Sequence, residues 1–491
     1  MPLLWLMAKK TSKGFLRVLL PLIAFTLISL LFRLAFINEL TLPLYFDSAE
    51  HWRIIAAILK NNNLFNLTPT YYHVGYHILT AFLSALTKTD IAQTMLISGQ
   101  VILTLIPIPV YVFIWYETKS TSAALFSALL SSFAWSMPGF AMNWGKYPML
   151  SGFLLGTTIL LYLRIFPAHQ RQKKMLAAIG ILATIFLHSR MLIFFLIALA
   201  SWIFAERTST KQKGTQRIAL GFGLVITFLT GLLIEKNALL KLTLDPYLNT
   251  PSVYITLSLI PLSILAYKKS PRDFFFSLYI ILGLFVSLFL PFNGDLLGVG
   301  KLTLLDRPFV ETLLYFPLAI IGGLGVARLS QIPPTSYAKK WFFIILIGSF
   351  SFYSLQNYSF SPSPCCNFIN ADDIAAMTWV RKNTPADAKL LIAADPLKVT
   401  PGTSPQNLSG SDAGIWLTNL TGRATLKFPY YSDFDKKSTQ MELCQKGINY
   451  IYAGDQPFSF NRSLHLSEQD WHQEVVSLPN VRIYKITSCP Q

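Results

Sequence analysis

The chain has 491 residues, of which 53% are hydrophobic and only 13% are charged, and its mean hydropathy is +0.46. Soluble globular domains carry about a quarter charged residues, so this composition excludes a single soluble core. A net charge of +17 would suggest nucleic acid as the partner of a soluble protein. Membrane proteins, however, gather Lys and Arg in their cytoplasmic loops. We therefore interpret the charge as a sign of membrane topology and expect no nucleic-acid partner.

Apolar runs recur from residue 14 to residue 356 and stop after Phe360. Each helix that crosses about 30 Å of hydrocarbon needs about 20 apolar residues. Basic clusters separate the runs, and placing every cluster inside the cell gives about eleven transmembrane helices. This arrangement leaves the N-terminus in the cytoplasm and the end of the chain outside it. The predicted spans are 14–37, 93–115, 122–138, 148–164, 174–187, 191–205, 217–234, 251–267, 273–291, 311–329 and 341–356.

Two segments of this pattern are ambiguous. The first outer loop, 38–92, contains an apolar stretch at 71–87 that would break the alternation of sides if it crossed. We interpret that stretch as a re-entrant or interfacial helix. Only His188, Ser189 and Arg190 separate the spans 174–187 and 191–205. Charge on both flanks favours a hairpin whose tip reaches the outer side, and one long tilted helix is the alternative.

Polar composition begins near residue 361 and predicts two domains, a transmembrane domain over 1–359 and a soluble extracytoplasmic domain over 360–491. A helix-like pattern at 372–381 precedes short β-like runs at 390–393, 450–452 and 481–486, as in a small α/β or α+β domain. All four cysteines lie in or beside this domain. They are compatible with one or two disulfides in an oxidising compartment, or with free thiols.

The predicted outer loops hold ionisable residues that membrane topology alone does not explain. Asp47 precedes an amphipathic helix in the first outer loop, and Glu50 follows it by three residues. The second outer loop carries one cation in a Gly/Pro-bent aromatic turn, the tip of the 174–205 hairpin carries another, and a late loop adds three more charged groups. These are Lys146, Arg190, Lys301, Asp306 and Arg307. A few carboxylates and several cations would thus share one side of the membrane.

This arrangement resembles the GT-C superfamily of integral membrane glycosyltransferases, which take a sugar from a polyprenyl-phosphate carrier. The likeness covers about residues 14–330, and it lies in Asp47 and in three segments of predicted outer loops. The segments are Tyr71-Tyr72-His73-Val74-Gly75-Tyr76-His77, Asn143-Trp144-Gly145-Lys146-Tyr147-Pro148 and Leu305-Asp306-Arg307-Pro308. The resemblance implies a GT-C-like transmembrane domain and an acceptor that is a glycan, a lipid or a protein.

The resemblance also implies roles for these residues. Asp47 would act as the catalytic base on the acceptor hydroxyl, because a phosphate leaving group needs little acid help. Glu50, Lys146, Arg190, Lys301, Asp306 and Arg307 would bind the substrates, with the cations holding the phosphate. The reaction would be an inverting transfer of one hexosyl or pentosyl unit. Lys146 stands where metal-using members place acids, so dependence on a divalent metal stays open.

Each candidate also has a structural interpretation. Asp47 and Glu50 could cap a surface helix, Lys146 could extend to lipid headgroups, and Arg307 could pair with Asp306. His51, His73 and His77 resemble interfacial anchors more than metal ligands. At the level of the whole protein, the alternatives are a lipid-linked glycan flippase or other transporter, and a polysaccharide polymerase or ligase. Transporters usually carry ionisable groups near the bilayer midplane, whereas here the charges fall at predicted helix ends.

Overall fold

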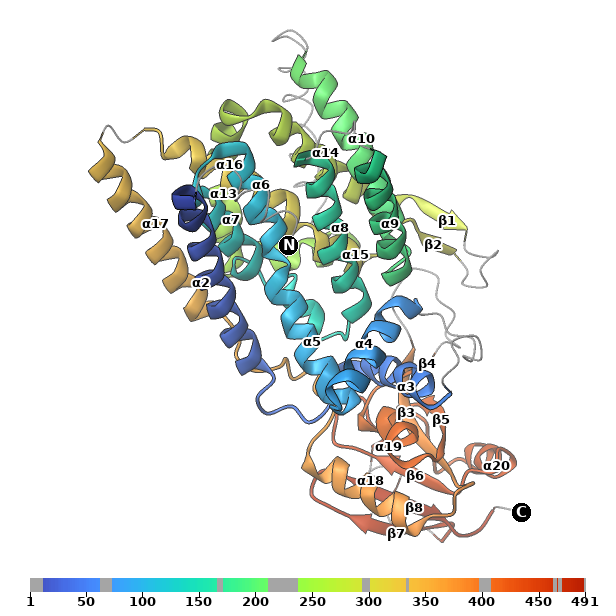
Figure 1. Ribbon diagram of the computed structural model, residues 1–491. Coiled ribbons are helices and arrows are strands. Elements are labelled where there is room, and N and C mark those ends of the chain that lie inside the picture. The colour runs from blue at the N-terminus through green and yellow to red at the C-terminus, as the bar shows by residue number, and fades with distance from the viewer. Residues whose placement is uncertain are drawn as a thin grey trace.

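The structure of the protein is a computed structural model. It describes residues 12–61, 73–165, 171–210, 237–293, 301–332, 335–396, 408–461, 466 and 470–489. Helices from about the first three quarters of the chain form one bundle, and the last quarter forms a sheet with its own helices at one end of it (Figure 1). We call this end of the bundle the domain end and the opposite one the distal end. The elements of the bundle are α2 (Ser12–Phe36), α3 (Tyr45–Asn61), α4 (Val74–Thr87), α5 (Ile91–Leu105), α6 (Pro107–Thr118), α7 (Thr121–Phe133), η2 (Gly139–Met142), α8 (Tyr147–Ile165), α9 (Arg171–Leu187), α10 (Met191–Thr210), α12 (Ala238–Leu248), α13 (Ser252–Lys269), α14 (Pro271–Phe289), β1 (Pro291–Asn293), β2 (Lys301–Thr303), α15 (Arg307–Leu313), α16 (Tyr315–Leu329) and α17 (Ser336–Asn357).

The protein is a polytopic integral membrane protein. Within the described residues, six helical segments are long and apolar enough to cross a bilayer, and the bent pair α12–α13 makes a seventh if it counts as one span. The six are Leu16–Phe36, Ile91–Thr118, Tyr147–Ile165, Met191–Ser209, Pro271–Phe289 and Arg307–Leu329.

The predicted count of about eleven spans is not confirmed. The expected spans at 122–138 and 174–187 correspond to shorter apolar helices, and the stretch at 71–87 corresponds to another, α4. The expected span at 341–356 lies in α17, which is not among the six. The span expected at 217–234 lies outside the described residues.

Helices α9 and α10 form a hairpin, as predicted from the charge on their flanks. A Cβ atom at Gly152 of α8 would contact His188 at 3.2 Å, and one at Gly156 would contact Thr184 at 3.4 Å. Increasing numbers on α8 thus meet decreasing numbers on α9, so the two helices are antiparallel. The same Gly152 Cβ would meet Met191 at 3.1 Å, so α10 begins beside the end of α9. One long continuous helix is therefore excluded.

Charged groups gather at the two ends of the bundle. At the distal end, Arg164 pairs with Glu117 at 2.7 Å, and Arg272 lies 3.7 Å from Glu117 and 3.8 Å from Glu206. At the domain end lie Lys146 and the candidate site. Helix α8 connects the two ends, and at 1.5 Å per residue its length approaches the roughly 30 Å of a hydrocarbon core. The separation of the two charged layers therefore matches a membrane.

The C-terminal sheet domain contains parallel and antiparallel strands. The central strand β3 pairs with β5 and β6 in parallel and with β4 in antiparallel fashion, and β8 joins β6 to β7 through antiparallel pairs. Helices cover both faces of the sheet, since α18 and α19 pack on one apolar cluster and α20 packs on another. The elements are α18 (Ala371–Asn383), β3 (Lys389–Pro396), β4 (Leu408–Gly410), η4 (Ala413–Trp416), α19 (Leu417–Thr421), β5 (Ala424–Pro429), α20 (Lys437–Gln445), β6 (Tyr450–Ala453), β7 (His472–Ser477) and β8 (Arg482–Ile486).

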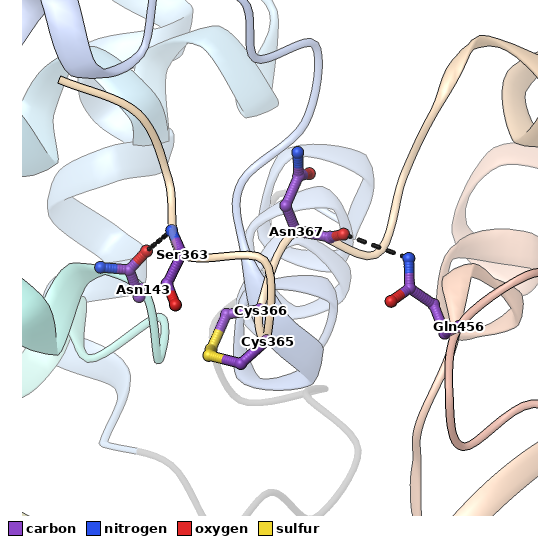
Figure 2. Close-up of a disulfide and its surroundings, with 6 residues drawn as sticks. All are labelled: Asn143, Ser363, Cys365, Cys366, Asn367 and Gln456. Carbon is purple, nitrogen blue, oxygen red and sulfur yellow. Dashed lines mark hydrogen bonds between the residues drawn. A yellow bond between two sulfur atoms is a disulfide. The ribbon is translucent and has the colours of Figure 1, made fainter. Parts of the chain in front are cut away.

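A short connection joins α17 to α18 and carries one of two disulfides. Cys365 and Cys366 are bonded to each other, and Cys444 is bonded to Cys489. Ser363 N donates to the side-chain oxygen of Asn143 at 2.8 Å, which ties the connection to the loop between α7 and α8 (Figure 2). On its other side, Gln456 of the sheet domain donates to Asn367 O at 3.3 Å.

Helix α3 shares its core with the sheet domain. Ala49 lies in the same apolar cluster as Trp416 and Leu417, and Trp52 packs against that cluster. The side-chain amide of Asn419 donates to Ala49 O at 2.7 Å. Helix α3 therefore lies between the membrane bundle and the sheet domain, with contacts to both.

Candidate active site

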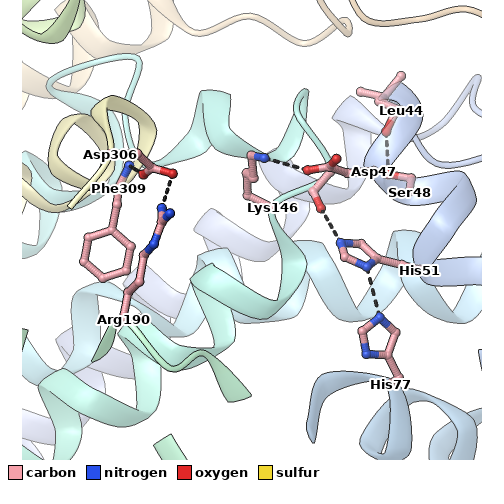
Figure 3. Close-up of polar contacts among 10 residues, drawn as sticks. Leu44, Asp47, Ser48, His51, His77, Lys146, Arg190, Asp306 and Phe309 are labelled. Carbon is pink, nitrogen blue, oxygen red and sulfur yellow. Dashed lines mark hydrogen bonds and ion pairs between the residues drawn. The ribbon is translucent and has the colours of Figure 1, made fainter. Parts of the chain in front are cut away.

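Asp47 lies in the first turn of α3, and its side chain is almost completely buried at the domain end of the bundle. The residue is 3% exposed, and one carboxylate oxygen lies 2.5 Å from Lys146 Nζ (Figure 3). Negative charge is favourable in the first turn of a helix because the unpaired backbone N–H groups there carry partial positive charge. Helix start and ion pair together hold the carboxylate in one position.

A tight turn brings Lys146 to Asp47. Gly145 has φ +65°, a left-handed conformation that an L-residue with a side chain adopts at a cost, and glycine adopts freely. A Cβ atom at Gly145 would lie 3.3 Å from Asp47 Cβ and 3.0 Å from Ser48 N. Lys146 follows directly and leads into α8. Its side chain pairs with the buried carboxylate of Asp47.

A second ion pair joins Arg190 at the hairpin tip to Asp306 (Figure 3). Asp306 is also the N-cap of α15, where its other oxygen accepts from Phe309 N at 3.1 Å. Burial alone would raise the pKa of the Asp306 carboxyl group, but Arg190 and Lys146 outweigh it and lower that pKa. Burial lowers the pKa of Lys146, yet Asp47 and Asp306 reverse this, so the net shift is upward. Two carboxylates and two cations thus form one charged cluster.

Arg307 lies beside this cluster, but its partner differs from the predicted one. Its guanidinium pairs with Glu311 at 3.2 Å, one turn along α15, and lies 5.6 Å from the ring centroid of Trp144. The expected pair with Asp306 is wrong, because Asp306 turns toward Arg190 and the helix N-terminus. Trp144 belongs to the same loop as Lys146, so Arg307 stays within the site region.

The other two predicted binding residues are placed differently. Glu50 accepts two hydrogen bonds from Arg53, at 2.9 and 2.6 Å, on a part-exposed face of α3. It is therefore engaged with its own helix rather than with the charged cluster. Lys301 begins β2, and its side chain lies outside the described residues.

A buried pair of histidines lies beneath Asp47. His51 Nδ1 is 3.0 Å from His77 Nε2, and His51 Nε2 is 3.1 Å from Gly145 O. His77 Nδ1 in turn lies 2.8 Å from His73 O. Burial lowers the pKa of His77 to about 4, and burial, His77 and Lys146 lower that of His51 well below its ordinary value.

The sequence predicts interfacial anchors at His51, His73 and His77, and the structure corrects this for His51 and His77, which are buried. A signal for the pair was present in the spacing. Asp47 and His51, like His73 and His77, are four residues apart and share a helix face. What the sequence lacked was the contact between α3 and α4, which brings the two faces together.

The described residues around Asp47 do not form a ligand set that fits a divalent metal ion. Hard cations such as Mg²⁺ take several oxygen ligands, usually carboxylates and carbonyls. Among the described residues, no three side chains of His, Cys, Asp or Glu come close enough together to hold a metal. The nearest partner of Asp47 is instead an ammonium group.

Comparison with known proteins places the chain in a structural context. A model described as a family of unknown function, DUF6541, matches residues 5–290. None of the curated proteins compared with the chain matches it.

Solved structures give clearer likenesses. The apo oligosaccharyltransferase of Archaeoglobus fulgidus has a TM-score of 0.55 at 14% identity, over 89% of this chain and 70% of the enzyme. The same enzyme tethered to an acceptor peptide has a TM-score of 0.54 at 13% identity. The arabinofuranosyltransferase AftD from Mycobacteria has a TM-score of 0.54 at 13% identity, over 95% of this chain and 40% of AftD. The chain thus spans less than half the length of AftD. These likenesses confirm a GT-C-like fold, as the resemblance in the sequence predicted.

Proposed function

Because this chain belongs to the DUF6541 family, whose function is unknown, we propose its activity from its fold and its site. The protein is a membrane glycosyltransferase that moves one monosaccharide, hexosyl or pentosyl, from a polyprenyl-phosphate carrier to an acceptor outside the cytoplasm. The acceptor is a glycan, a lipid or a protein. Similar structures belong to an oligosaccharyltransferase and an arabinofuranosyltransferase, both of which transfer sugars.

The observation that carries this proposal is the charged cluster at the domain end. Asp47 is a single carboxylate beside Lys146, and Arg190 and Asp306 form the adjoining pair. A glycosidase needs two carboxylates because its leaving alkoxide must be protonated. Transfer from a lipid phosphate needs one base and several cations, since phosphate leaves as a stable anion. The cluster contains two carboxylates, but Asp306 accepts hydrogen bonds from Arg190 and from Phe309 N, so Asp47 is the candidate base. Lys146 and Arg190 are the cations beside it.

In this mechanism, Asp47 takes the proton of the acceptor hydroxyl as the acceptor oxygen attacks the anomeric carbon. The bond from that carbon to the phosphate oxygen breaks, and its electron pair leaves with the phosphate. Attack opposite to the leaving group inverts the anomeric centre. General-base help of this kind contributes roughly 10²–10⁴-fold in rate.

The cations serve the leaving group. Lys146, Arg190 and Arg307 lie in or beside the cluster, and fixed positive charge stabilises the phosphate as its negative charge grows. The side chain of Lys146 is 26% exposed while that of Asp47 is 4% exposed, so Lys146 is the reachable member of their pair. A donor phosphate that binds Lys146 would draw it away from Asp47 and leave the carboxylate free to accept a proton.

The test uses purified protein in lipid vesicles and labelled polyprenyl-phosphate sugars. The wild type should release polyprenyl phosphate from at least one of these donors. Asp47→Asn keeps the size of the side chain and removes its charge, and should lower the rate roughly 10²–10⁴-fold. Glu50→Gln should have a milder effect because Glu50 pairs with Arg53.

Glu442→Gln is the matched control, because it removes a carboxylate from an exposed pair with Lys446 far along the chain. Near-normal transfer by Asp47→Asn would contradict the role of this residue as a base. A wild type that consumes none of the donors would contradict the enzyme itself, and a flippase or other transporter, or a polymerase or ligase, would replace it.

A further inference from the structure

Among the described residues, one buried arginine outside the charged cluster has no acidic ion-pair partner. Arg33 lies near the end of α2 and is 5% exposed. Its Nη2 donates to Ser132 O at 2.7 Å, and its guanidinium lies 5.3 Å from the ring centroid of Phe133 and 5.6 Å from that of Tyr358. In the described part of the chain, no carboxylate forms an ion pair with Arg33, and its Nε has no hydrogen-bond partner.

The guanidinium faces a cavity of about 200 Å³ at the domain end of the bundle. Two more polar atoms of its lining lack partners, Gln100 Nε2 and Ser132 Oγ, and these residues are 1% and 4% exposed. Water can complete hydrogen bonds in such a cavity, but it cannot neutralise a buried charge. A buried cation whose own Nε lacks a partner, beside two further unpartnered polar groups, has the features of an anion site. Guanidinium groups favour phosphate in particular.

An apolar groove continues from this cavity along the bundle. It has a volume of about 360 Å³, is lined by α2, α7 and α17, and shares Phe133 and Tyr358 with the cavity. On α2 its lining runs from Pro21 to Phe32, and at 1.5 Å per residue this is roughly 16 Å. That length is about half of a hydrocarbon core, the depth of one leaflet.

We propose that cavity and groove together bind one phospholipid of the leaflet at the domain end. Its phosphodiester pairs with Arg33 and accepts from Gln100 and Ser132, and an acyl chain lies in the groove between α2, α7 and α17. A phosphodiester carries one negative charge, which matches the one positive charge of Arg33. The half-bilayer length of the groove fits an acyl chain better than a long polyprenyl chain. This inference does not rest on the proposed transferase activity.

The site adjoins the candidate active site through one loop. A Cβ atom at Gly139 would lie 2.6 Å from Arg33 Nη1, and Gly145 of the same loop lies against Asp47. Asn143, between them, lines the cavity and holds the connection to the sheet domain. The bound lipid would therefore support the loop that carries Lys146.

The experiment measures lipid binding to the purified full chain by native mass spectrometry and by thermal shift. The probes are phosphatidylglycerol, diacylglycerol with the same chains, inorganic phosphate and polyprenyl phosphate. The wild type should retain one phosphatidylglycerol and gain thermal stability from it, whereas diacylglycerol and inorganic phosphate should bind at least tenfold more weakly. Arg33→Gln should weaken phosphatidylglycerol binding at least tenfold. Arg17→Gln, an exposed arginine on the same helix, should leave it unchanged.

Three outcomes would overturn the proposal. Equal phosphatidylglycerol binding by Arg33→Gln would remove the anion site, and equal binding of inorganic phosphate would remove the groove. Stronger, Arg33-dependent binding of polyprenyl phosphate would replace the phospholipid by the carrier. If Arg33→Gln does not fold, Ala24→Trp fills the groove from an exposed position on α2 and should produce the same loss of binding.

Discussion

Gly145 lies directly against Ser48, so that a methyl group at Gly145 would come within 2.5 Å of Ser48 Oγ. The contact connects the loop between α7 and α8 to the first turn of α3, next to the ion pair of Asp47 and Lys146. Ser48 cannot move away freely, because it is fully buried and its hydroxyl donates to Leu44 O. The position of Asp47, the candidate base, thus depends on residue 145 being a glycine without a side chain.

The first prediction concerns this contact. Gly145→Ala places a residue with a Cβ at φ +65°, which costs about 1–2 kcal/mol, and pushes Ser48 and Asp47 apart from the loop. We predict a lower melting temperature and a loss of transfer of up to about 10²-fold, as expected when reacting groups are misplaced by about 1 Å.

Gly348→Ala is the control for this change. Gly348 lies in the interior of α17, and among the described residues a Cβ there would meet no atom within 4 Å outside its own stretch of helix. Alanine there should leave both stability and transfer intact, since it has the higher helix propensity. Equal behaviour of the two variants would contradict the positional role of Gly145.

The second prediction concerns the cations. Arg190→Ala and Arg307→Ala should raise the donor concentration needed for half-maximal transfer, and replacement by Lys should rescue only part because a bidentate guanidinium is lost. Arg190→Ala also leaves the Asp306 carboxylate without its ion-pair partner and should lower stability.

The double variant Arg190→Ala with Asp306→Asn separates these effects. It removes both charges, so it should recover stability but not donor use. Unchanged donor dependence in both single Ala variants, at normal expression in the membrane, would reduce the two arginines to structural counter-ions.

The third prediction concerns acid. The pKa of His77 is about 4 in the folded protein and 6.5 in its ordinary state. The unfolded chain therefore takes up this proton first, and folding stability falls as the pH drops from about 6.5 to about 4. The full loss of folding stability below about pH 4 corresponds to about 3 kcal/mol. Above pH 7 His77 is neutral in both states, so folding stability no longer changes with pH because of this group.

His77→Gln removes that titration. Melting temperatures measured in detergent between pH 7.5 and pH 4.5 should therefore fall less steeply for the variant than for the wild type. Burial raises the pKa of Asp412 to about 7 and that of Asp373 to about 6, which acts in the opposite direction in the sheet domain of both proteins. Parallel curves for variant and wild type would show that His77 does not lose its proton on folding.

The fourth prediction concerns topology. The N-terminus should lie in the cytoplasm and the sheet domain outside it, because an odd number of crossings separates them in our count. A reporter fused after Gln491 that is active only outside the cytoplasm should therefore be active. The disulfides Cys365–Cys366 and Cys444–Cys489 agree with an oxidising compartment. Activity of a cytoplasmic reporter at the same position would reverse the orientation.

Hydropathy and periodicity predicted the parts of this fold that depend on local sequence. Six of the predicted apolar runs form membrane-length helices in the described residues. The β-like runs at 390–393, 450–452 and 481–486 lie in β3, β6 and β8. The irregular helices were harder, since α12 and α13 bend by 86° at their junction and no single run shows this. Strands β4, β5 and β7 were missed because their neighbours, not their own residues, define them as strands.

The site was predictable as a set of residues but not as a set of contacts. Asp47, Lys146, Arg190 and Asp306 were each placed in loops on one side, and the structure brings them together. Their pairing follows from the packing of helices that are far apart in sequence. Arg307 is the cation nearest to Asp306 in sequence. Asp306, however, caps the N-terminus of α15 and pairs with Arg190, whereas Arg307 pairs with Glu311. No rule of spacing contains that information.

The shared core of α3 and the sheet domain has a mechanical consequence. The backbone of α3 is held at Tyr45, whose N–H donates to Cys366 O at 3.0 Å, and at Ala49, whose carbonyl accepts from Asn419. These two anchors flank Asp47, and both come from more than 300 residues later in the chain. A displacement of the sheet domain would therefore reach α3 through these two contacts, on either side of Asp47. The position of the Asp47 carboxylate thus depends on the sheet domain, through α3, as well as on the bundle, through Lys146.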